Sequence, residues 1–326
     1  MTKRIRFVMA IMVVLTAFFA FTINKANSET PPPKLGIWQN PPYLSGTWLQ
    51  KQTAAESQFG AFAGHWRQFK PPSSNGQLSS DEEWALNNGK RLFSNWKVAG
   101  SLTWAQTAAG ARDSAIVAAA QDWAATCEDN GECWITFHHE PENDIGSSGS
   151  GMTAVDYRNM LQHVVPLWRT YASEVKVVWT MMGYEGHRPL YPILYPGDGY
   201  VDYIGHDPYI NATENPLNLA NKMITRSQWF TTNISSTKPY VIAEWGTDLK
   251  YGRGTVQHRT DAINEVTRLL PELSSVGIIE LDHFNARDHY LSTPDLSGAD
   301  SAAFKALKNA TEIVAPTPTV TATPCP

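Results

Sequence analysis

Two glutamates, each at the end of an apolar, β-rich run, are the residues of this chain best placed to do chemistry. Glu140 follows the run Cys133–His139, and Glu244 closes the run Tyr240–Glu244. Loop-like sequence comes directly after each of them. If both runs are strands of one parallel barrel, the two carboxylates meet over its mouth. A facing pair of carboxylates is the machinery that breaks a glycosidic bond.

The two carboxylates would have different roles. We expect Glu140 to be the general acid/base, which requires burial and a nearby negative charge to keep it protonated near neutral pH. We expect Glu244 to be the nucleophile, because a carboxylate after the apolar Val241-Ile242-Ala243 is costly unless it is paired or functional. Opposed strand ends suit the roughly 5–5.5 Å carboxyl separation of retaining enzymes, so we predict retention. The structural alternative for Glu140 is a strand-end ion pair.

Eight runs rich in β-branched or aromatic residues are expected to form the strands that position these glutamates. They are Leu35–Gln39, Ala61–Gln68, Val98–Trp104, Cys133–His139, Val175–Met181, Val201–Asp207, Tyr240–Glu244 and Gly277–His283.

Helix-like stretches separate most of these runs. They are Asp81–Leu92, Ala111–Ala125, Thr153–Tyr171, Leu217–Phe230, Arg259–Leu270 and Ser301–Thr311. Alternating strands and helices predict an α/β fold with a parallel sheet. Eight units within residues 33–314 predict closure into a (β/α)8 TIM barrel, in which the fourth and seventh strands lie across the mouth.

Two of the predicted helices carry local signals. Ser80, followed three residues later by Glu83, predicts the first turn of the helix Asp81–Leu92. Pro166 predicts a kink or break within Thr153–Tyr171, because proline removes a backbone donor.

The two ends of the chain do not resemble the barrel. Residues 1–28 combine a basic start with a short apolar run and are expected to be a secretory signal peptide, with an uncleaved anchor as the alternative. Residues 315–326 are rich in proline and threonine and are expected to be a linker or tail that leads to a further module. These features predict a secreted, extracellular protein.

The composition limits the classes of binding partner that we expect. The net charge is −5 without basic blocks, so we expect no nucleic-acid partner and, after signal cleavage, no membrane partner. Twelve tryptophans favour a carbohydrate partner, because flat aromatic faces hold sugars. Cys127 and Cys133 flank a turn-rich loop and are predicted to form a disulfide, with two free thiols as the alternative. We expect a monomer.

Three segments carry a resemblance to glycoside hydrolase family 26, the β-mannanase family, in a clan of retaining (β/α)8 enzymes. His139-Glu140 resembles the His-Glu pair of that family, whereas most of the clan has Asn-Glu. The stretch Tyr195–Tyr209 is similar to its sixth-strand segment, and Ile242–Gly246 is similar to its nucleophile strand. The likeness extends from Leu35 to about Asn285.

The resemblance implies roles for these residues. Glu140 would be the acid/base, Glu244 the nucleophile, and Tyr209 a hydrogen-bond donor to that nucleophile. Phe284 would stack under the scissile sugar. The implied substrate is β-1,4-mannan, cut internally, with xylan or β-glucan next. The family follows His-Glu with an apolar residue, Asn and Gly, whereas this chain has Pro141-Glu142-Asn143, so the loop on the leaving-group side differs.

Histidine and arginine side chains are further candidates. Strand alternation places His138 on the face of Glu140, but the resemblance favours His139, so we predict His139 as the binding residue and keep His138 open. Arg67 is a candidate to orient Glu244, with a core ion pair as the alternative. His206 and Asp207 precede Tyr209 and are candidates to line the site.

Three tryptophans are candidate sugar platforms. Trp104 and Trp179 are expected at the floor of the site, with core packing as the alternative for each. Trp245, next to Gly246, is expected to let a sugar approach closely.

The sequence lacks the motifs that are typical of other classes of enzyme. No Gly-x-Gly-x-x-Gly follows the first run and no P-loop is present, so no nucleotide cofactor is expected. The first run lacks His-x-His and the chain lacks His-Glu-x-x-His, so we expect no catalytic metal. A Gly-x-Ser-x-Gly elbow is also absent. The rival class is a non-catalytic barrel that binds carbohydrate, and a second alternative is a hydrolase of the same clan with another substrate.

Overall fold

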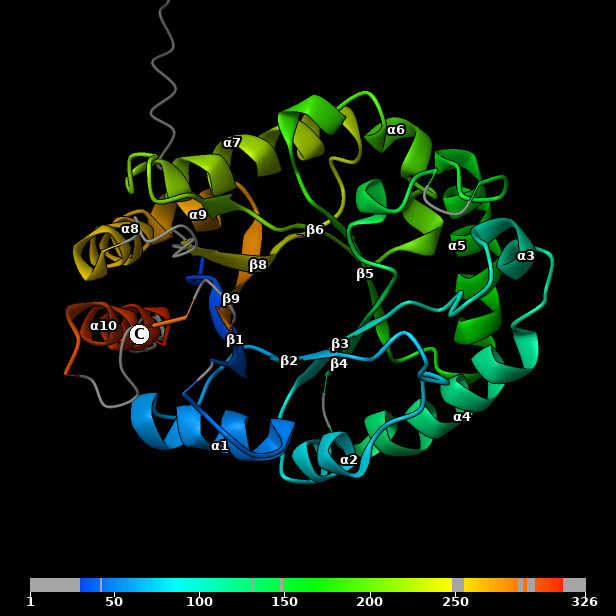
Figure 1. The fold of residues 1–326 in the computed structure, drawn as a ribbon, viewed down its shortest axis with the longest axis horizontal. Helices are drawn as coiled ribbons and strands as arrows, with labels where there is room; N and C mark the ends of the chain where they lie inside the picture. The colour runs from blue at the N-terminus through cyan, green and yellow to red at the C-terminus, as the bar shows by residue number, and fades with distance from the viewer. Residues whose placement is uncertain are drawn as a thin grey trace, which may run out of the picture.

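Eight parallel strands close into a barrel with helices around it, as Figure 1 shows in a view down the barrel. The computed structural model describes residues 30–41, 43–130, 132–146, 149–247, 255–286, 290–291 and 297–312. The strands run in the order β6-β5-β4-β3-β2-β1-β9-β8, and pairing of β6 with β8 closes the ring. The predicted (β/α)8 TIM barrel is therefore confirmed.

The barrel strands are short and nearly all buried. They are β1 (Lys34–Asn40), β2 (Trp66–Phe69), β3 (Leu92–Trp96), β4 (Cys133–Phe137), β5 (Lys176–Met181), β6 (Tyr203–His206), β8 (Tyr240–Thr247) and β9 (Ile278–Ala286). A two-residue strand, β7 (Tyr209–Ile210), pairs with the end of β8.

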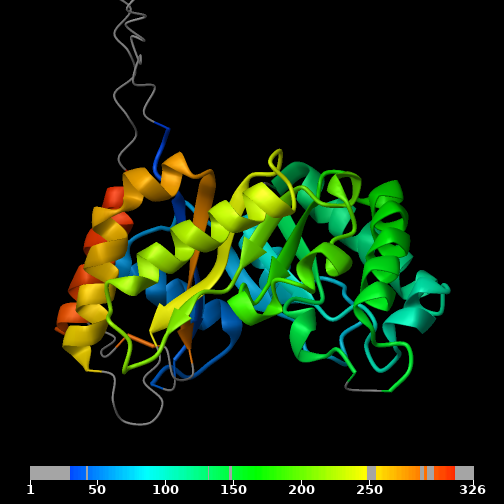
Figure 2. The ribbon, with the colours of Figure 1, turned by 90° about the horizontal axis from the view of Figure 1, so that it is seen from above.

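The helices form the outer layer, which Figure 2 shows from the side. They are α1 (Trp48–Phe59), α2 (Ser80–Asn87), α3 (Trp104–Ala108), α4 (Asp113–Asn130), α5 (Ala154–Tyr171), α6 (Tyr191–Leu194), α7 (Asn218–Asn233), α8 (Val256–Arg268), α9 (Leu270–Ser275) and α10 (Ala299–Thr311). Short 3-10 turns lie at η1 (Pro141–Asn143), η2 (Glu185–His187) and η3 (Asp198–Tyr200). Across the described ranges, every helix is too short or too polar to cross a membrane.

Two layers of side chains make the core. Inside the barrel, Phe93, Trp134, Val178, Val241 and Ala243 pack together. A larger cluster fills the space between the strands and the helices. Because the barrel interior is packed, a ligand has access only at the ends of the strands.

The third strand was predicted in the wrong place. Val98–Trp104 is loop and the start of α3, whereas β3 is Leu92–Trp96, which begins at the last residue of the predicted helix Asp81–Leu92. The chain leaves α2 through Gly89, whose φ of 72° is in the left-handed region. Ser94, a polar residue in a buried strand, masks the apolar pattern; its hydroxyl donates to Glu82 at 2.8 Å.

Two local helix predictions were also wrong. The N-cap of α2 is Ser79, which forms a capping box with Glu82 one residue earlier than predicted. α5 runs as one helix through Pro166 rather than breaking there. Pro166 is exposed, while Val165 and Trp168 are fully buried and hold both parts of the helix on the core.

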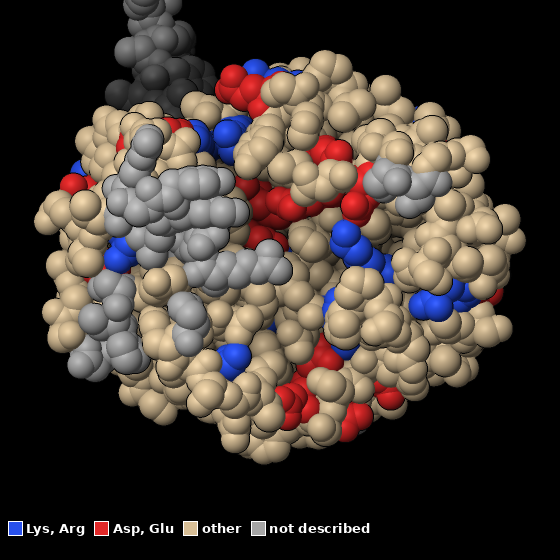
Figure 3. All heavy atoms as spheres, viewed as in Figure 1, with Lys and Arg blue, Asp and Glu red and all other residues tan. Residues whose placement is uncertain are grey.

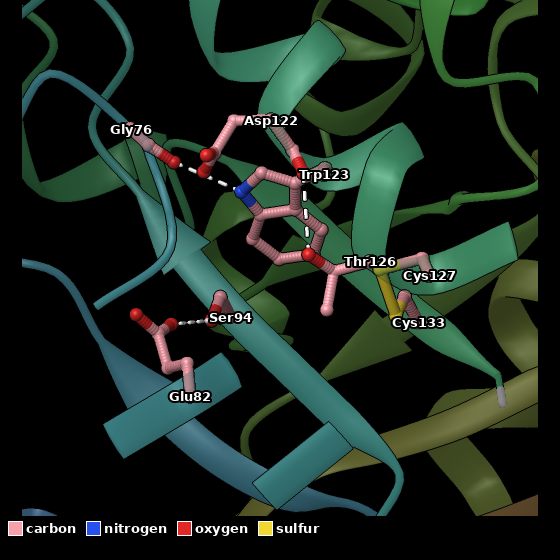
Figure 4. The surroundings of a disulfide bond; sticks show 8 residues. All are labelled: Gly76, Glu82, Ser94, Asp122, Trp123, Thr126, Cys127 and Cys133. Carbon is pink, nitrogen blue, oxygen red and sulfur yellow. Dashed lines mark hydrogen bonds between the residues drawn. A yellow bond between two sulfur atoms is a disulfide. The ribbon is translucent and has the colours of Figure 1, made fainter. Parts of the chain in front are cut away.

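A disulfide joins the end of α4 to the start of β4. Cys127 and Cys133 are bonded, with Cα atoms 6.0 Å apart. Figure 4 shows the bond close to Trp123, whose indole N–H donates to the carbonyl oxygen of Gly76 at 2.9 Å. The bond anchors the N-terminal end of the strand that leads to Glu140.

The barrel elements run from Lys34 to Thr311, within the predicted domain of residues 33–314. The predicted signal peptide (residues 1–28) and tail (residues 315–326) lie outside the described residues.

Candidate active site

A strained turn after β4 carries Glu140. His138 has φ 66° and Glu140 has φ 49°, left-handed conformations that cost non-glycine residues about 1–3 kcal/mol each. Backbone hydrogen bonds to both neighbouring strands hold the turn: the His138 N–H donates to the Trp96 carbonyl at 2.8 Å, and the Glu140 N–H donates to the Thr180 carbonyl at 3.1 Å. The turn thus fixes Glu140 at the carboxyl end of the barrel.

His138 stabilises this turn and points away from Glu244. The Trp104 indole donates to His138 Nδ1 at 3.3 Å, so the ring proton is on Nε2, which lies 2.6 Å from Asp144 Oδ2. The Tyr157 hydroxyl donates to the His138 carbonyl at 3.3 Å. His138 therefore positions the chain beside Glu140, and it is His139 that lies in the site.

A β-bulge aims Glu244 into the barrel. Ile242 pairs with Leu281 and Trp245 with His283, so three steps along β8 match two along β9. The extra residue lets Ala243 and Glu244 both face inward, while Trp245 faces the helices. Bulges that redirect side chains are common next to active sites.

Three side chains from other strands surround the Glu244 carboxylate. The Tyr209 hydroxyl donates to Oε2 at 2.8 Å, Arg67 Nη2 lies 3.4 Å from Oε1, and His139 Nε2 lies 3.9 Å from Oε1. Glu244 is 7% exposed. A phenol donor and a guanidinium beside a buried carboxylate favour its charged form and fix its orientation.

Arg67 is itself fixed by packing. Its guanidinium carbon lies 3.8 Å from the centroid of the Phe93 ring, inside the barrel. This stacking keeps the planar group beneath Glu244, because the guanidinium is buried and has little room to turn.

The surroundings of Glu140 favour its neutral form, whereas the contacts of Glu244 favour the charged form. Burial, the Glu244 carboxylate and the Glu142 carboxylate together raise the pKa of Glu140 to about 8. The Asn143 amide donates to its Oε2 at 3.0 Å. Glu140 is therefore held as a proton donor near neutral pH beside a carboxylate whose contacts favour the charged form, which is the division of roles that acid-assisted displacement needs.

Aromatic rings line the mouth beside Glu244. The Phe284 ring centroid lies 4.5 Å from that of Trp38, 5.9 Å from that of Phe69 and 6.1 Å from that of Tyr209. These rings come from β1, β2, β7 and β9. Figure 3 shows Asp and Glu side chains gathered at the centre of the same view. The mouth thus combines acidic groups with flat apolar faces.

The three predicted tryptophan platforms are buried, so we correct those predictions. Trp104 and Trp245 are 0% exposed and Trp179 is 1% exposed. Trp104 packs edge-on against Tyr157, Trp179 against Tyr195, and Trp245 against His283. All three lie in the cluster between strands and helices, where no sugar can reach them.

His206 is also buried outside the barrel interior. It is 0% exposed and its ring stacks near Phe230 of α7, with centroids 6.3 Å apart. The prediction that it lines the site is therefore corrected. Asp207, the other candidate of this pair, is 1% exposed, and burial and the charges of Glu244 and Glu140 raise the pKa of Asp207 well above its usual range.

Strand alternation explains why the two neighbouring candidates, His206 and Asp207, differ. Tyr203 packs on the barrel interior, so period-two alternation places Asp207, not His206, on the inner face. Glu142 was not predicted as a site residue; it is half-buried and its Oε1 accepts the Met182 N–H at 2.9 Å, neither of which its sequence context shows. Over the ranges that the structure describes, no group of three or more His, Cys, Asp or Glu residues is arranged to hold a metal ion.

The same fold occurs in solved glycoside hydrolases. A GH26 β-mannanase from Bacteroides ovatus superposes with a TM-score of 0.63 at 15% identity, over 88% of this chain and 91% of that one. The catalytic domain of a GH26 endo-β-1,4-mannanase from Bacillus sp. JAMB-750 gives 0.60 at 13% identity, over 86% of each chain. A GH5-4 broad-specificity endoglucanase from an uncultured bacterium gives 0.53 at 10% identity, over 78% and 83%.

No protein-family model and no curated protein matches the sequence. The shared property is thus the fold: this chain has the (β/α)8 barrel that GH26 mannanases and a GH5 endoglucanase also have.

Proposed function

We propose that this protein is a secreted, retaining glycoside hydrolase that cleaves internal β-linkages of a polysaccharide. The observation that carries the proposal is the pairing of Glu140, whose pKa is raised to about 8, with a Glu244 carboxylate held by Tyr209 and Arg67. The two residues come from β4 and β8, the fourth and seventh strands of the barrel.

The chemistry proceeds in two displacements. Glu244 attacks the anomeric carbon, while Glu140 gives its proton to the leaving glycosidic oxygen. This forms a glycosyl ester and removes the negative charge of Glu244. Because that charge is one cause of the raised pKa of Glu140, its loss makes Glu140 easier to ionise. The Glu140 carboxylate then takes a proton from water, which attacks the same carbon and releases Glu244.

β-1,4-Mannan is the first substrate to test, with xylan and β-glucan next. Two of the solved structures with this fold are titled GH26 mannanases and a third is titled an endoglucanase. The rings of Trp38, Phe69 and Phe284 form an aromatic cluster that supports a pyranose site beside Glu244. Residues 1–28 support secretion through their sequence pattern alone.

The test is reducing-sugar release from galactomannan, glucomannan, xylan, lichenan and curdlan. Wild type is compared with Glu244→Gln, which keeps the shape and removes the nucleophile, and with Glu83→Gln, a matched change at an exposed glutamate of α2. We expect release by wild type and Glu83→Gln and none by Glu244→Gln. Polysaccharide binding without release, unchanged in Glu244→Gln, would contradict the proposal and indicate a carbohydrate-binding barrel.

A further inference from the structure

Tyr184 is an exposed aromatic side chain on the same side of the mouth as Glu140. It lies between β5 and η2 and is 42% exposed. β5 is the strand whose Thr180 carbonyl accepts the Glu140 N–H. Besides burial, the charges of Glu140 and Asp207 raise the pKa of the Tyr184 phenol, so its ring lies within electrostatic reach of the reacting carboxyls.

A hydrogen bond ties the backbone beside Tyr184 to the turn that carries Glu140. The Met182 N–H donates to Glu142 Oε1 at 2.9 Å, which ties this segment to the residue two places after Glu140. Gly183 has φ 73°, and a β-carbon there would lie 2.6 Å from the His206 ring, so only glycine fits at this position. The position of Tyr184 is therefore set by the same elements that set Glu140.

Neighbouring residues hold both the backbone and the ring of Tyr184. The Tyr184 backbone carbonyl accepts a hydrogen bond from the Tyr191 hydroxyl at 3.1 Å. The Arg226 guanidinium carbon lies 5.7 Å from the Tyr184 ring centroid, and the His187 ring centroid lies 6.0 Å away. An exposed ring that is held by a cation and a neighbouring ring loses little freedom when a ligand stacks on it.

The strand order says which part of a substrate would meet this ring. Phe284 lies on β9, which pairs with β8, and its ring contacts Trp38 on β1, so both rings lie on the β9 side of the nucleophile Glu244. Tyr184 follows β5, which pairs with β4 and lies across the barrel from β1. A polysaccharide that crosses the mouth would place its bond-forming sugar on the β1–β9 side and its leaving part on the β5 side.

We propose that Tyr184 is a stacking platform for the pyranose on the leaving-group side of the scissile bond. The inference rests on the proposed function and deepens it, because it names a residue that would select long β-linked substrates over short ones. Family resemblance did not indicate Tyr184, and the leaving-group loop is where this sequence departs from the family pattern.

The test compares two substrates that differ in the leaving part. One is the polysaccharide that wild type cleaves best, and the other is the matching disaccharyl fluoride, which has no sugar on the leaving side. We measure kcat/KM for wild type, Tyr184→Ala, Tyr184→Phe and Tyr171→Ala. Tyr171 is 41% exposed at the C-terminal end of α5 and precedes the N-terminal end of β5, which is the strand end opposite to the site, so it is the matched control.

We expect Tyr184→Ala to lower kcat/KM for the polysaccharide about tenfold relative to kcat/KM for the fluoride. Tyr184→Phe keeps the ring face and should keep the wild-type ratio, as should Tyr171→Ala. If wild type is active and Tyr184→Ala keeps the wild-type ratio of the two kcat/KM values, this inference is overturned and the proposed function still stands. Wild type inactive on both substrates would overturn the proposed function and this inference with it.

Discussion

At the scale of single residues, two chemically identical side chains differ in role because their surroundings differ. Glu244 has Tyr209 and Arg67 on its oxygens, which favour the anion. Glu140 is partly buried beside two other carboxylates, Glu244 and Glu142, which favour its neutral form. Acid and nucleophile are thus assigned by environment rather than by residue type.

The Tyr209 hydroxyl provides the first residue-scale prediction. Hydrogen bonds to charged groups contribute about 1.5–3 kcal/mol, so we expect Tyr209→Phe to lower kcat/KM about 10- to 100-fold. The phenol stays protonated as a donor, because burial and Glu244 raise the pKa of Tyr209 well above its usual range. Steady-state kinetics with an unchanged melting temperature would check this, and wild-type kcat/KM in the variant would contradict it.

Glu142 provides a prediction on pH. Its charge is one cause of the raised pKa of Glu140, so Glu142→Gln should lower the pKa of Glu140. A general acid is lost as pH rises through its pKa, which is about 8 in wild type. The alkaline limb of kcat/KM should therefore move to lower pH in Glu142→Gln and stay in place in Glu83→Gln. A limb that does not move would show that Glu142 has no electrostatic influence on the acid.

The raised pKa of Glu140 also predicts how stability depends on pH. The folded pKa of about 8 exceeds the ordinary 4.5, so Glu140 contributes stability at low pH that is lost as pH rises from about 4.5 to about 8. Glu140→Gln has no such loss. We expect the melting temperature of Glu140→Gln minus that of wild type to grow over this window and to level off above it. A constant difference from pH 5 to pH 9 would contradict the assignment.

At the scale of elements, two irregular features rather than regular strands aim the carboxylates. The left-handed turn after β4 presents Glu140, and the bulge in β8 presents Glu244. Apolar runs that end in glutamate were enough to predict that both residues lie at strand ends. The bulge has no sequence signature, and it is the reason that Trp245 faces the helices rather than a sugar.

The incorrect predictions also have physical causes. β3 was missed because Ser94 and Asn95 interrupt its apolar pattern, and burial of Ser94 depends on a hydrogen bond to Glu82 of the preceding helix, α2. Trp104 and Trp179 were predicted as platforms because the sequence gives their residue type and not the face on which they lie. Exposure of Tyr184 depends on how the segment after β5 packs, which a single sequence does not reveal.

The disulfide gives the prediction at the element scale. It closes a short loop between α4 and β4, with a sequence separation of 6, and such a crosslink contributes about 2 kcal/mol by restricting the unfolded chain. Cys127→Ser/Cys133→Ser should lower the free energy of unfolding in urea by about this amount. Activity at 25 °C should remain, because Cys133 starts β4 and Glu140 follows its opposite end. Equal unfolding free energies would contradict the prediction.

At the scale of the whole molecule, the closed barrel brings together residues far apart in the chain. Arg67, Glu140, Tyr209 and Glu244 come from β2, the turn after β4, β7 and β8, and only ring closure places them at one mouth. The alternation of strands and helices predicted this closure. Carboxyl groups at the strand ends of a small closed barrel suit the roughly 5–5.5 Å separation of retaining enzymes, so we predict retention.

Retention is tested on the first product formed. Proton NMR of a β-linked oligosaccharide during the first minutes of cleavage should show the β-anomer before mutarotation. An initial α-anomer would show inversion and would mean that Glu244 acts as a base rather than as a nucleophile.

The central claim, that Glu244 forms a covalent bond to the sugar and Glu140 supplies the proton, is tested most directly by trapping the intermediate. A 2-deoxy-2-fluoro glycosyl fluoride slows both steps and the good leaving group allows the first, so the ester should accumulate. Mass spectrometry of the intact protein and of its peptides should show one added sugar, located on Glu244. A sugar located on any other residue, in an enzyme that cleaves its substrate, would contradict the account.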